Sequence, residues 1–182
     1  WETGGVGSSL AHVMVVAGTR RDWAAIDEAG WRRLAGELGT VVADAGGAWL
    51  TIRAYESGED VPASSGLDGL HLTAADGRCV VLIDPVSDGR ERFASAMRQL
   101  PAGSAVDEKA VAGVLYAPAD VEPDLVLVLG PSTRLPPSLV WELAYGELVF
   151  LPIALADLRG QHLVEAIEDF QGRRRRFGGL DT

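Results

Sequence analysis

The chain has 182 residues, of which 47% are hydrophobic and 23% are charged, and its formal net charge is −10. This length and composition predict one soluble globular domain with a real hydrophobic core. The negative charge argues against a general nucleic-acid binder, and the single cysteine, Cys79, excludes an internal disulfide. No apolar run reaches the roughly 18 residues that a membrane-spanning helix needs, so no transmembrane segment is expected.

Short apolar runs alternate with amphipathic segments along the chain. The continuously apolar run 13–16 predicts a buried strand, whereas apolar residues at helical spacing predict a helix over 27–45. Asp76-Gly77 supplies the residues of a tight turn, and the polar stretch 55–69 predicts a loop. The predicted elements, in chain order, are strand 13–16, helix 27–45, strand 49–55, hairpin strands 70–73 and 79–83, helices 88–100 and 107–115, strand 125–129, helix 138–145, strand 148–151 and helix 161–176.

This alternation of strands and helices predicts an α/β fold, with a mostly parallel central sheet flanked by helices. We expect one domain over residues 12–182, preceded by a flexible N-terminal segment, 1–11. Ligands of such sheets bind beyond the carboxyl ends of the strands. Three loops that follow predicted strands are therefore the places to search for a site: 17–21, 84–89 and 130–134.

The histidines give no sign of a metal site. His12, His71 and His162 lie far apart and lack the spacing of metal ligands. We interpret all three as structural residues.

The C-terminal third of the chain contains Pro123-Asp124-Leu125, the run 141–150 and the run 157–179 in this order. The first two resemble a strand and the following helix of the undecaprenyl diphosphate synthase (cis-prenyltransferase) family, and 157–179 continues that family's pattern. His12-Val13 and the loop ending in Trp23-Ala24 resemble the family's first strand and loop. The resemblance implies the cis-prenyltransferase α/β fold, not the all-α fold of trans-prenyltransferases. It also implies condensation of isopentenyl diphosphate onto an allylic diphosphate.

The chain departs from the family where this chemistry needs charge. Ala17 or Gly18 stands at the position of the family's metal-binding aspartate. Of the two arginines that the family places after its later strand, one matches Arg134, whereas the other falls on Val128 or Leu129. The resemblance therefore implies no catalytic residue and no metal site in this chain.

The family's apolar tunnel is also curtailed. Where active members insert long apolar helices, this chain has the polar loop 61–66. A prenyl chain leaves water for an apolar wall at about 0.8 kcal/mol per methylene, and this chain lacks the residues to build that wall.

One functional element of the family is retained near the C-terminus. Arg176-Phe177-Gly178 fits the Arg-x-Gly motif, which in the family reaches across the dimer and helps to hold isopentenyl diphosphate in the neighbouring site. Loss of the aspartate with retention of this tail resembles the Nogo-B receptor type of accessory subunit. The alternative is a solvated helix end, with Gly178-Gly179 as its C-cap.

The resemblance also implies diphosphate-binding and interface residues. Arg20 and Arg21, with Arg134, could bind a diphosphate, although arginines in a turn are commonly surface residues. Glu147 is a metal-associated acid, a partner-facing acid or a surface carboxylate. The predicted interface residues are Trp141, Tyr145, Glu147 and Phe150.

Three functions follow from these observations. The first is a non-catalytic accessory subunit of a heteromeric cis-prenyltransferase that makes polyprenyl diphosphate. It would donate Arg176 and Gly178 to a shared isopentenyl diphosphate site, in a heterodimer or heterotetramer. This chain alone would bind no cofactor, since Mg²⁺ would lie in the partner's active site. We expect a cytoplasmic protein that reaches the membrane periphery only through its complex.

The second function is a homodimeric short-chain prenyl diphosphate transferase or cyclase. Its diphosphate site would use the loop 130–134 with Arg20 and Arg21. The third is a pure interaction protein that retains the fold for its dimer surface and binds no diphosphate.

Overall fold

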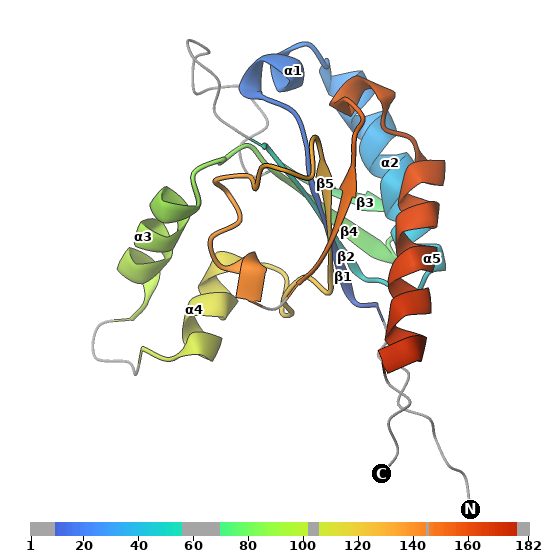
Figure 1. Ribbon diagram of the computed structural model, residues 1–182. Helices are drawn as coiled ribbons and strands as arrows, with labels where there is room; N and C mark the ends of the chain where they lie inside the picture. Colours follow the sequence, from blue (N-terminus) through green and yellow to red (C-terminus); the bar gives the residue numbers. More distant parts are fainter. Residues whose placement is uncertain (1–9, 56–69, 102–105, 145, 178–182) are drawn as a thin grey trace, which may run out of the picture.

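The computed structural model describes residues 10–55, 70–101, 106–144 and 146–177 (Figure 1). Its centre is a six-stranded sheet in the order β3-β4-β2-β1-β5-β6. Only β3 is antiparallel to its neighbour, β4, and the other pairs are parallel, which confirms the predicted α/β class. The strands are β1 His12–Val16, β2 Trp49–Arg53, β3 Leu70–Ala74, β4 Cys79–Asp84, β5 Leu125–Leu129 and β6 Glu147–Leu151.

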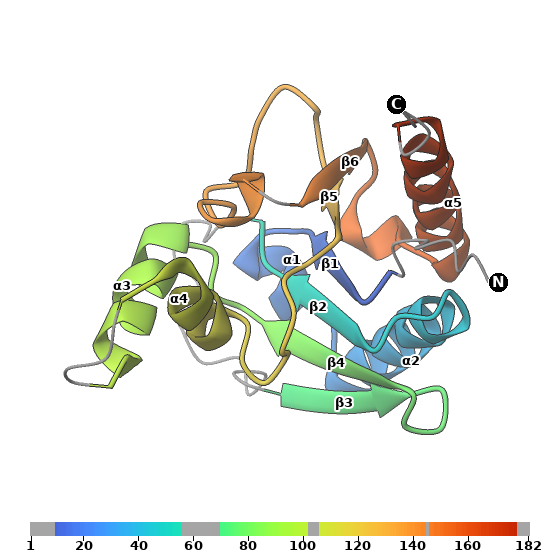
Figure 2. The ribbon, with the colours of Figure 1, turned by 90° about the horizontal axis from the view of Figure 1, so that it is seen from below.

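Helices cover both faces of this sheet, as expected. Helices α2 (Glu28–Asp44) and α5 (Gly160–Phe177) pack on one face, and α3 (Gly89–Gln99) and α4 (Glu108–Leu115) lie on the other (Figures 1 and 2). The short helix α1 (Arg20–Ala24) follows β1 at the carboxyl edge of the sheet.

The apolar strands are explained by burial on both faces. Along β1, Val13 and Val15 join the core beneath α2 and α5, whereas Met14 and Val16 join a second core beneath α4. All four are fully buried, and full burial of such a side chain stabilises the fold by roughly 1.5–3 kcal/mol. A strand covered on both faces has no polar alternation, which is why continuous apolar runs predicted β1 and β5.

Part of the segment predicted to be flexible packs on the domain. Leu10 is buried, and the backbone N–H groups of Ala11 and His12 donate to Asp124 Oδ2 at 2.8 and 3.1 Å. These bonds attach the start of β1 to the residue before β5. Residues 1–9 lie outside the described part of the chain.

The helix starts predicted near 27, 88 and 107, and the predicted hairpin, are confirmed. Asp27, Asp88 and Asp107 each cap a helix by accepting hydrogen bonds from backbone N–H groups of its first turn. Between β3 and β4, Asp76 and Gly77 have φ angles of 56° and 85°, the left-handed conformation that a tight turn needs. The loop predicted over 55–69 lies outside the described residues beyond Tyr55.

The helix predicted over 138–145 is wrong. Within the described residues of that stretch, the only helical turn is the 3₁₀ turn η1 (Glu142–Ala144). So short a run after Pro136-Pro137 gains little from helix formation, and tertiary contacts instead turn Ser138 and Glu142 inward.

The loop expected over 17–21 is shorter than predicted, because α1 begins at Arg20. A capping box stabilises the start of α1. The Asp22 carboxylate accepts from the N–H of Thr19 at 2.7 Å, and the Thr19 hydroxyl caps the N–H of Asp22. This Thr-x-x-Asp signal is visible in the sequence.

Candidate functional site

A cleft of about 410 Å³ opens at the carboxyl ends of β2 and β4. Three arginines from three different elements line it: Arg20 of α1, Arg53 of β2 and Arg92 of α3. The carboxylates of Asp84 and Glu91 also line it. The cleft therefore lies where parallel sheets commonly bind ligands, and its wall combines these charged groups with apolar side chains such as Leu82, Ile83, Val86 and Leu115.

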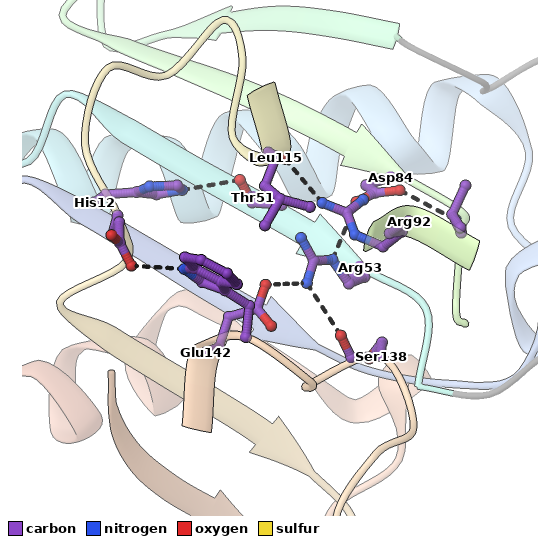
Figure 3. Close-up of polar contacts among 11 residues, drawn as sticks. His12, Thr51, Arg53, Asp84, Arg92, Leu115, Ser138 and Glu142 are labelled. Atoms are coloured by element: carbon purple, nitrogen blue, oxygen red, sulfur yellow. Dashed lines mark hydrogen bonds and ion pairs between the residues drawn. The ribbon is translucent and has the colours of Figure 1, made fainter. Parts of the chain in front are cut away.

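Arg53 occupies the centre of this wall. It is the last residue of β2 and lies in register with Asp84, the last residue of β4. Its Nε donates to Asp84 Oδ2 at 3.0 Å, and its Nη1 donates to Glu142 Oε1 at 2.5 Å (Figure 3). Nη1 also lies 3.5 Å from the carbonyl oxygen of Ser138. The Arg53 side chain is only 1% exposed, so these contacts replace its water.

Arg92 extends the same network to the helices. Its Nη1 forms an ion pair with Asp84 Oδ2, and its Nη2 donates to the carbonyl oxygen of Leu115, the last residue of α4, at 3.0 Å (Figure 3). We call Arg53, Asp84, Arg92 and Glu142 the Arg53 cluster. It contains two cations and two anions, so its net charge is zero.

The electrostatics hold Arg53 and Glu142 in their charged forms. Burial alone would raise the pKa of Glu142, but the charge and hydrogen bond of Arg53 lower that pKa below its usual value. Burial alone would lower the pKa of Arg53, but the charges of Glu142 and Asp84 raise that pKa above its usual value. The pKa of Arg92 is lowered by burial and by repulsion from Arg53. The built-in carboxylates therefore neutralise both cations of the cluster.

The loop after β1 already uses several of its oxygens in hydrogen bonds within the chain. Its Ala17 carbonyl accepts from Trp23 Nε1 at 2.7 Å, and its Gly18 carbonyl accepts from the N–H of Tyr55 at 2.8 Å. Asp22 Oδ2 is held by the N–H and the hydroxyl of Thr19. Mg²⁺ prefers carboxylate and water oxygens in octahedral geometry. The described residues also contain no group of three or more His, Cys, Asp or Glu side chains that could hold a metal.

The predicted diphosphate-binding arginines do not all meet at the cleft. Arg20 lines it, and its buried Nε has no hydrogen-bond partner among the described residues. Arg21 is exposed and is not part of the lining. Arg134 lies outside the lining as well, with its guanidinium 5.9 Å from the centre of the Tyr55 ring. Their role in binding a diphosphate stays a prediction.

Of the predicted interface residues, Glu147 and Phe150 lie on β6, the edge strand, and Trp141 lies in the connection before it. Trp141 stacks on Phe93 with ring centres 6.0 Å apart, and Phe150 packs beside the core beneath α4. Glu147 begins β6 and lies 3.5 Å from Arg173 of α5. Tyr145 lies outside the described residues. Contact with a partner remains a prediction for all four.

The Arg-x-Gly motif lies at the end of α5. Arg176 belongs to the last turn of that helix, and Gly178 lies outside the described residues. Contact of Arg173 with Glu147 places this turn at the amino-terminal edge of the sheet, because Glu147 pairs with Leu125, the first residue of β5. The helix of 18 residues is about 27 Å long and runs away from the carboxyl edge (Figure 1).

Sequence reasoning missed the Arg53 cluster. A signal was present, since Arg53 and Asp84 each end an otherwise apolar strand. Such a charge, placed where a parallel sheet presents its carboxyl edge, indicates a buried or functional group.

His12 is a core residue, consistent with a structural role. Its ring nitrogens lie 2.9 Å from the Val121 carbonyl oxygen and 2.9 Å from Thr51 Oγ1 (Figure 3). Burial lowers the pKa of His12 to about 4. His12 is therefore neutral at pH 7.

None of the helices in the described part of the chain is both long enough and apolar enough to span a membrane.

Comparison with known sequences identifies relatives of this chain. The family model "Putative undecaprenyl diphosphate synthase" matches residues 70–178. An isoprenyl transferase of Heliobacterium mobile is 31% identical over 142 residues, which are 72% of this chain and 55% of that protein. A ditrans,polycis-undecaprenyl-diphosphate synthase ((2E,6E)-farnesyl-diphosphate specific) of Xanthomonas axonopodis pv. citri is 36% identical over 58% of this chain and 44% of its own length. The chain thus spans about half the length of these relatives.

Solved structures share the fold. A probable undecaprenyl diphosphate synthase from Campylobacter jejuni superposes with a TM-score of 0.58 at 16% identity, covering 90% of this chain and 96% of the other. Lavandulyl diphosphate synthase from Lavandula x intermedia, in complex with dimethylallyl diphosphate, superposes with a TM-score of 0.59 at 16% identity. This superposition covers 90% of this chain and 95% of the other. At this identity the likeness concerns the fold alone.

Proposed function

Because the chain belongs to the undecaprenyl diphosphate synthase family, we propose that it is a non-catalytic accessory subunit of a heteromeric cis-prenyltransferase. A catalytic subunit of the same family would supply the magnesium site and the apolar tunnel. This chain would donate Arg176 and Gly178 to a shared isopentenyl diphosphate site, in the manner of the Nogo-B receptor type of subunit. The complex would be a heterodimer or a heterotetramer.

The observation that carries this proposal is the separation between the cleft and the tail. The cleft lies at the carboxyl edge of the sheet, whereas α5 ends at the opposite edge, beside Glu147. Each strand between these edges is about 15 Å long, and α5 runs the whole way. A motif at the end of α5 is therefore poorly placed to serve the chain's own cleft and better placed to serve a neighbour.

The charge of the cleft supports the same proposal. A prenyl chain gains free energy only against apolar surface. Here Arg53, Asp84 and Arg92 line the cleft, and their charges are already paired with one another. An apolar chain placed against this charged part of the wall would cover the cluster's remaining water, at a free-energy cost, although Leu82, Ile83, Val86 and Leu115 give the cleft an apolar part as well. The paired arginines also offer little unpaired charge to a diphosphate.

The first test is co-expression with a catalytic cis-prenyltransferase from the same host. We expect a complex whose turnover falls roughly 100-fold on Arg176→Ala, the loss typical of a charged donor that stabilises an anion in an active site. Arg174→Ala, in the same arginine run, is the matched control and should retain turnover. A complex that forms but is indifferent to Arg176→Ala would instead support a pure interaction protein.

One observation favours a second candidate, the homodimeric short-chain prenyl diphosphate transferase or cyclase. Arg20 Nε is buried at the cleft without a partner among the described residues, and a bound anion would satisfy it. On this hypothesis Arg20→Met should abolish product formation by the isolated chain, whereas Arg33→Met, an exposed arginine of α2, should not.

A further inference from the structure

Two charged residues that line the cleft stay outside the Arg53 cluster. They are Arg20, the first residue of α1, and Glu91, in the first turn of α3, and both helices begin at the carboxyl edge of the sheet (Figure 1). Neither side chain forms an ion pair within the described part of the chain, although every charge of the cluster is paired. His71 also lines the cleft, but it carries no permanent charge. The cleft therefore presents one free cation and one free anion.

Two buried polar atoms of the same lining lack hydrogen bonds. Arg20 Nε and the hydroxyl of Tyr116 are both buried, and neither has a hydrogen-bond partner among the described residues. Tyr116 as a whole is only 4% exposed. Buried polar atoms in folded proteins are nearly always bonded to protein, water or a ligand. A molecule with donors and acceptors of its own would therefore gain hydrogen bonds in this cleft.

Much of the remaining lining is aliphatic. Leu82, Ile83, Val86 and Leu115 contribute to it. The volume of about 410 Å³ falls within the roughly 300–1,000 Å³ that is usual for a small-molecule site. A ligand that matches the cleft thus has an aliphatic body of modest size in addition to its polar groups.

From these features we infer that the cleft binds a small aliphatic zwitterion, an amino acid whose carboxylate pairs with Arg20 and whose ammonium group pairs with Glu91. Such a ligand neutralises both free charges and leaves the Arg53 cluster as it is. A simple anion would pair with Arg20 but would be repelled by Glu91, and a diphosphate would be repelled more strongly because it carries more negative charge. The inference goes beyond the proposed function and does not depend on a partner subunit.

Calorimetric titration of the full chain at pH 7 with matched probes tests the ligand class. The probes are leucine, isocaproate, which lacks the ammonium group of leucine, and isoamylamine, which lacks the carboxylate. A further zwitterion, ε-aminocaproate, carries its two charges at opposite ends and reports how far apart the cleft holds them. We expect one of the two zwitterions to bind about tenfold more tightly than either singly charged probe, since a hydrogen bond to a charged group contributes about that factor.

Two variants test the contacts. Glu91→Gln should weaken binding of the zwitterion about tenfold but leave binding of isocaproate unchanged, because isocaproate has no ammonium group. Arg20→Met should likewise weaken the zwitterion and spare isoamylamine. Glu165→Gln and Arg33→Met change exposed charges of α5 and α2, outside the cleft, and should bind every probe as the wild type does. Glu91 is exposed, so its substitution should leave the fold intact.

Three results would overturn the inference: no probe binds, the zwitterions bind no more tightly than their singly charged analogues, or Glu91→Gln weakens all probes equally. Inorganic pyrophosphate is the competing probe. If it binds more tightly than both zwitterions, and more tightly still to Glu91→Gln, the cleft is an anion site and the inference is rejected. None of these results bears on the donation of Arg176, which the turnover of the complex tests.

Discussion

At the scale of single residues, the main feature is a buried arginine whose charge is balanced by two carboxylates. Arg53 loses its water on folding and regains its bonds from Asp84 and Glu142. Such a network is costly to break on one side only, because the remaining charge stays buried and unpaired. The cluster therefore makes the carboxyl edge of the sheet rigid and charged.

We predict that Arg53→Met lowers the free energy of unfolding by about 3–5 kcal/mol, because Glu142 is left without its cation. The matched control is Arg78→Met, which breaks the ion pair between Arg78 and Asp44. The side chains of Arg78 and Asp44 are 54% and 62% exposed. An exposed pair contributes less than about 1 kcal/mol. Urea unfolding measures the loss of stability in Arg53→Met and in Arg78→Met, and equal losses would contradict the role described for Arg53.

His12 gives a prediction about pH. Its pKa is about 4 in the folded chain and about 6.5 when unfolded, so the unfolded chain takes up the proton first as pH falls. The stabilisation that neutral His12 contributes is complete above pH 6.5 and is lost as the pH falls from 6.5 to 4. At pH 4.5 the free energy of unfolding is lower by roughly 2–3 kcal/mol. Measured between pH 6.5 and 4, the free energy of unfolding should depend less on pH in His12→Gln than in the wild type. The wild-type dependence on pH should persist in His71→Gln, which changes an exposed histidine.

At the scale of elements, two of the three glycines of α2, Gly39 and Gly36, have opposite surroundings. A Cβ on Gly39 would lie 2.5 Å from Ala74 Cβ and 2.9 Å from Val81 Cγ2, so this glycine lets α2 approach β3 and β4 closely. A Cβ on Gly36 would meet nothing within 4 Å.

The same substitution should therefore act in opposite directions. We predict that Gly39→Ala destabilises the chain by roughly 1–3 kcal/mol, because both strands must shift. Gly36→Ala should stabilise it by about 0.5–1 kcal/mol, since alanine is the better helix former. Thermal unfolding compares the two variants, and a loss of stability in Gly36→Ala would contradict the packing described for α2.

These elements also show what the sequence could and could not predict. β1 and β5 were predictable because burial on both faces leaves a continuous apolar run, and the β3–β4 hairpin because Asp76-Gly77 specifies its turn. The contact between Arg53 and Glu142 was not predictable, because the two residues are 89 positions apart and Glu142 alone resembles a surface charge. Their meeting depends on sheet order, in which only β1 separates β2 from β5, and on the path of the connection that follows β5. The same contact holds Glu142 in the short turn η1, within the described part of the helix predicted over 138–145.

At the scale of the whole molecule, the two candidate functional features lie at opposite ends of the sheet. The charged cleft occupies the carboxyl edge, and the turn that carries Arg176 occupies the amino-terminal edge. This arrangement follows from the antiparallel course of α5 across the sheet. On the proposed function, a second subunit would combine this tail with its own site.

Product formation by the isolated chain tests this account most directly. The purified chain is incubated with Mg²⁺, labelled isopentenyl diphosphate and an allylic diphosphate, with and without the co-expressed catalytic subunit. We predict no labelled prenyl product from the chain alone, and turnover in the complex that exceeds that of the catalytic subunit by itself. Labelled product formed by the chain without any partner, and lost on Arg20→Met, would contradict the account.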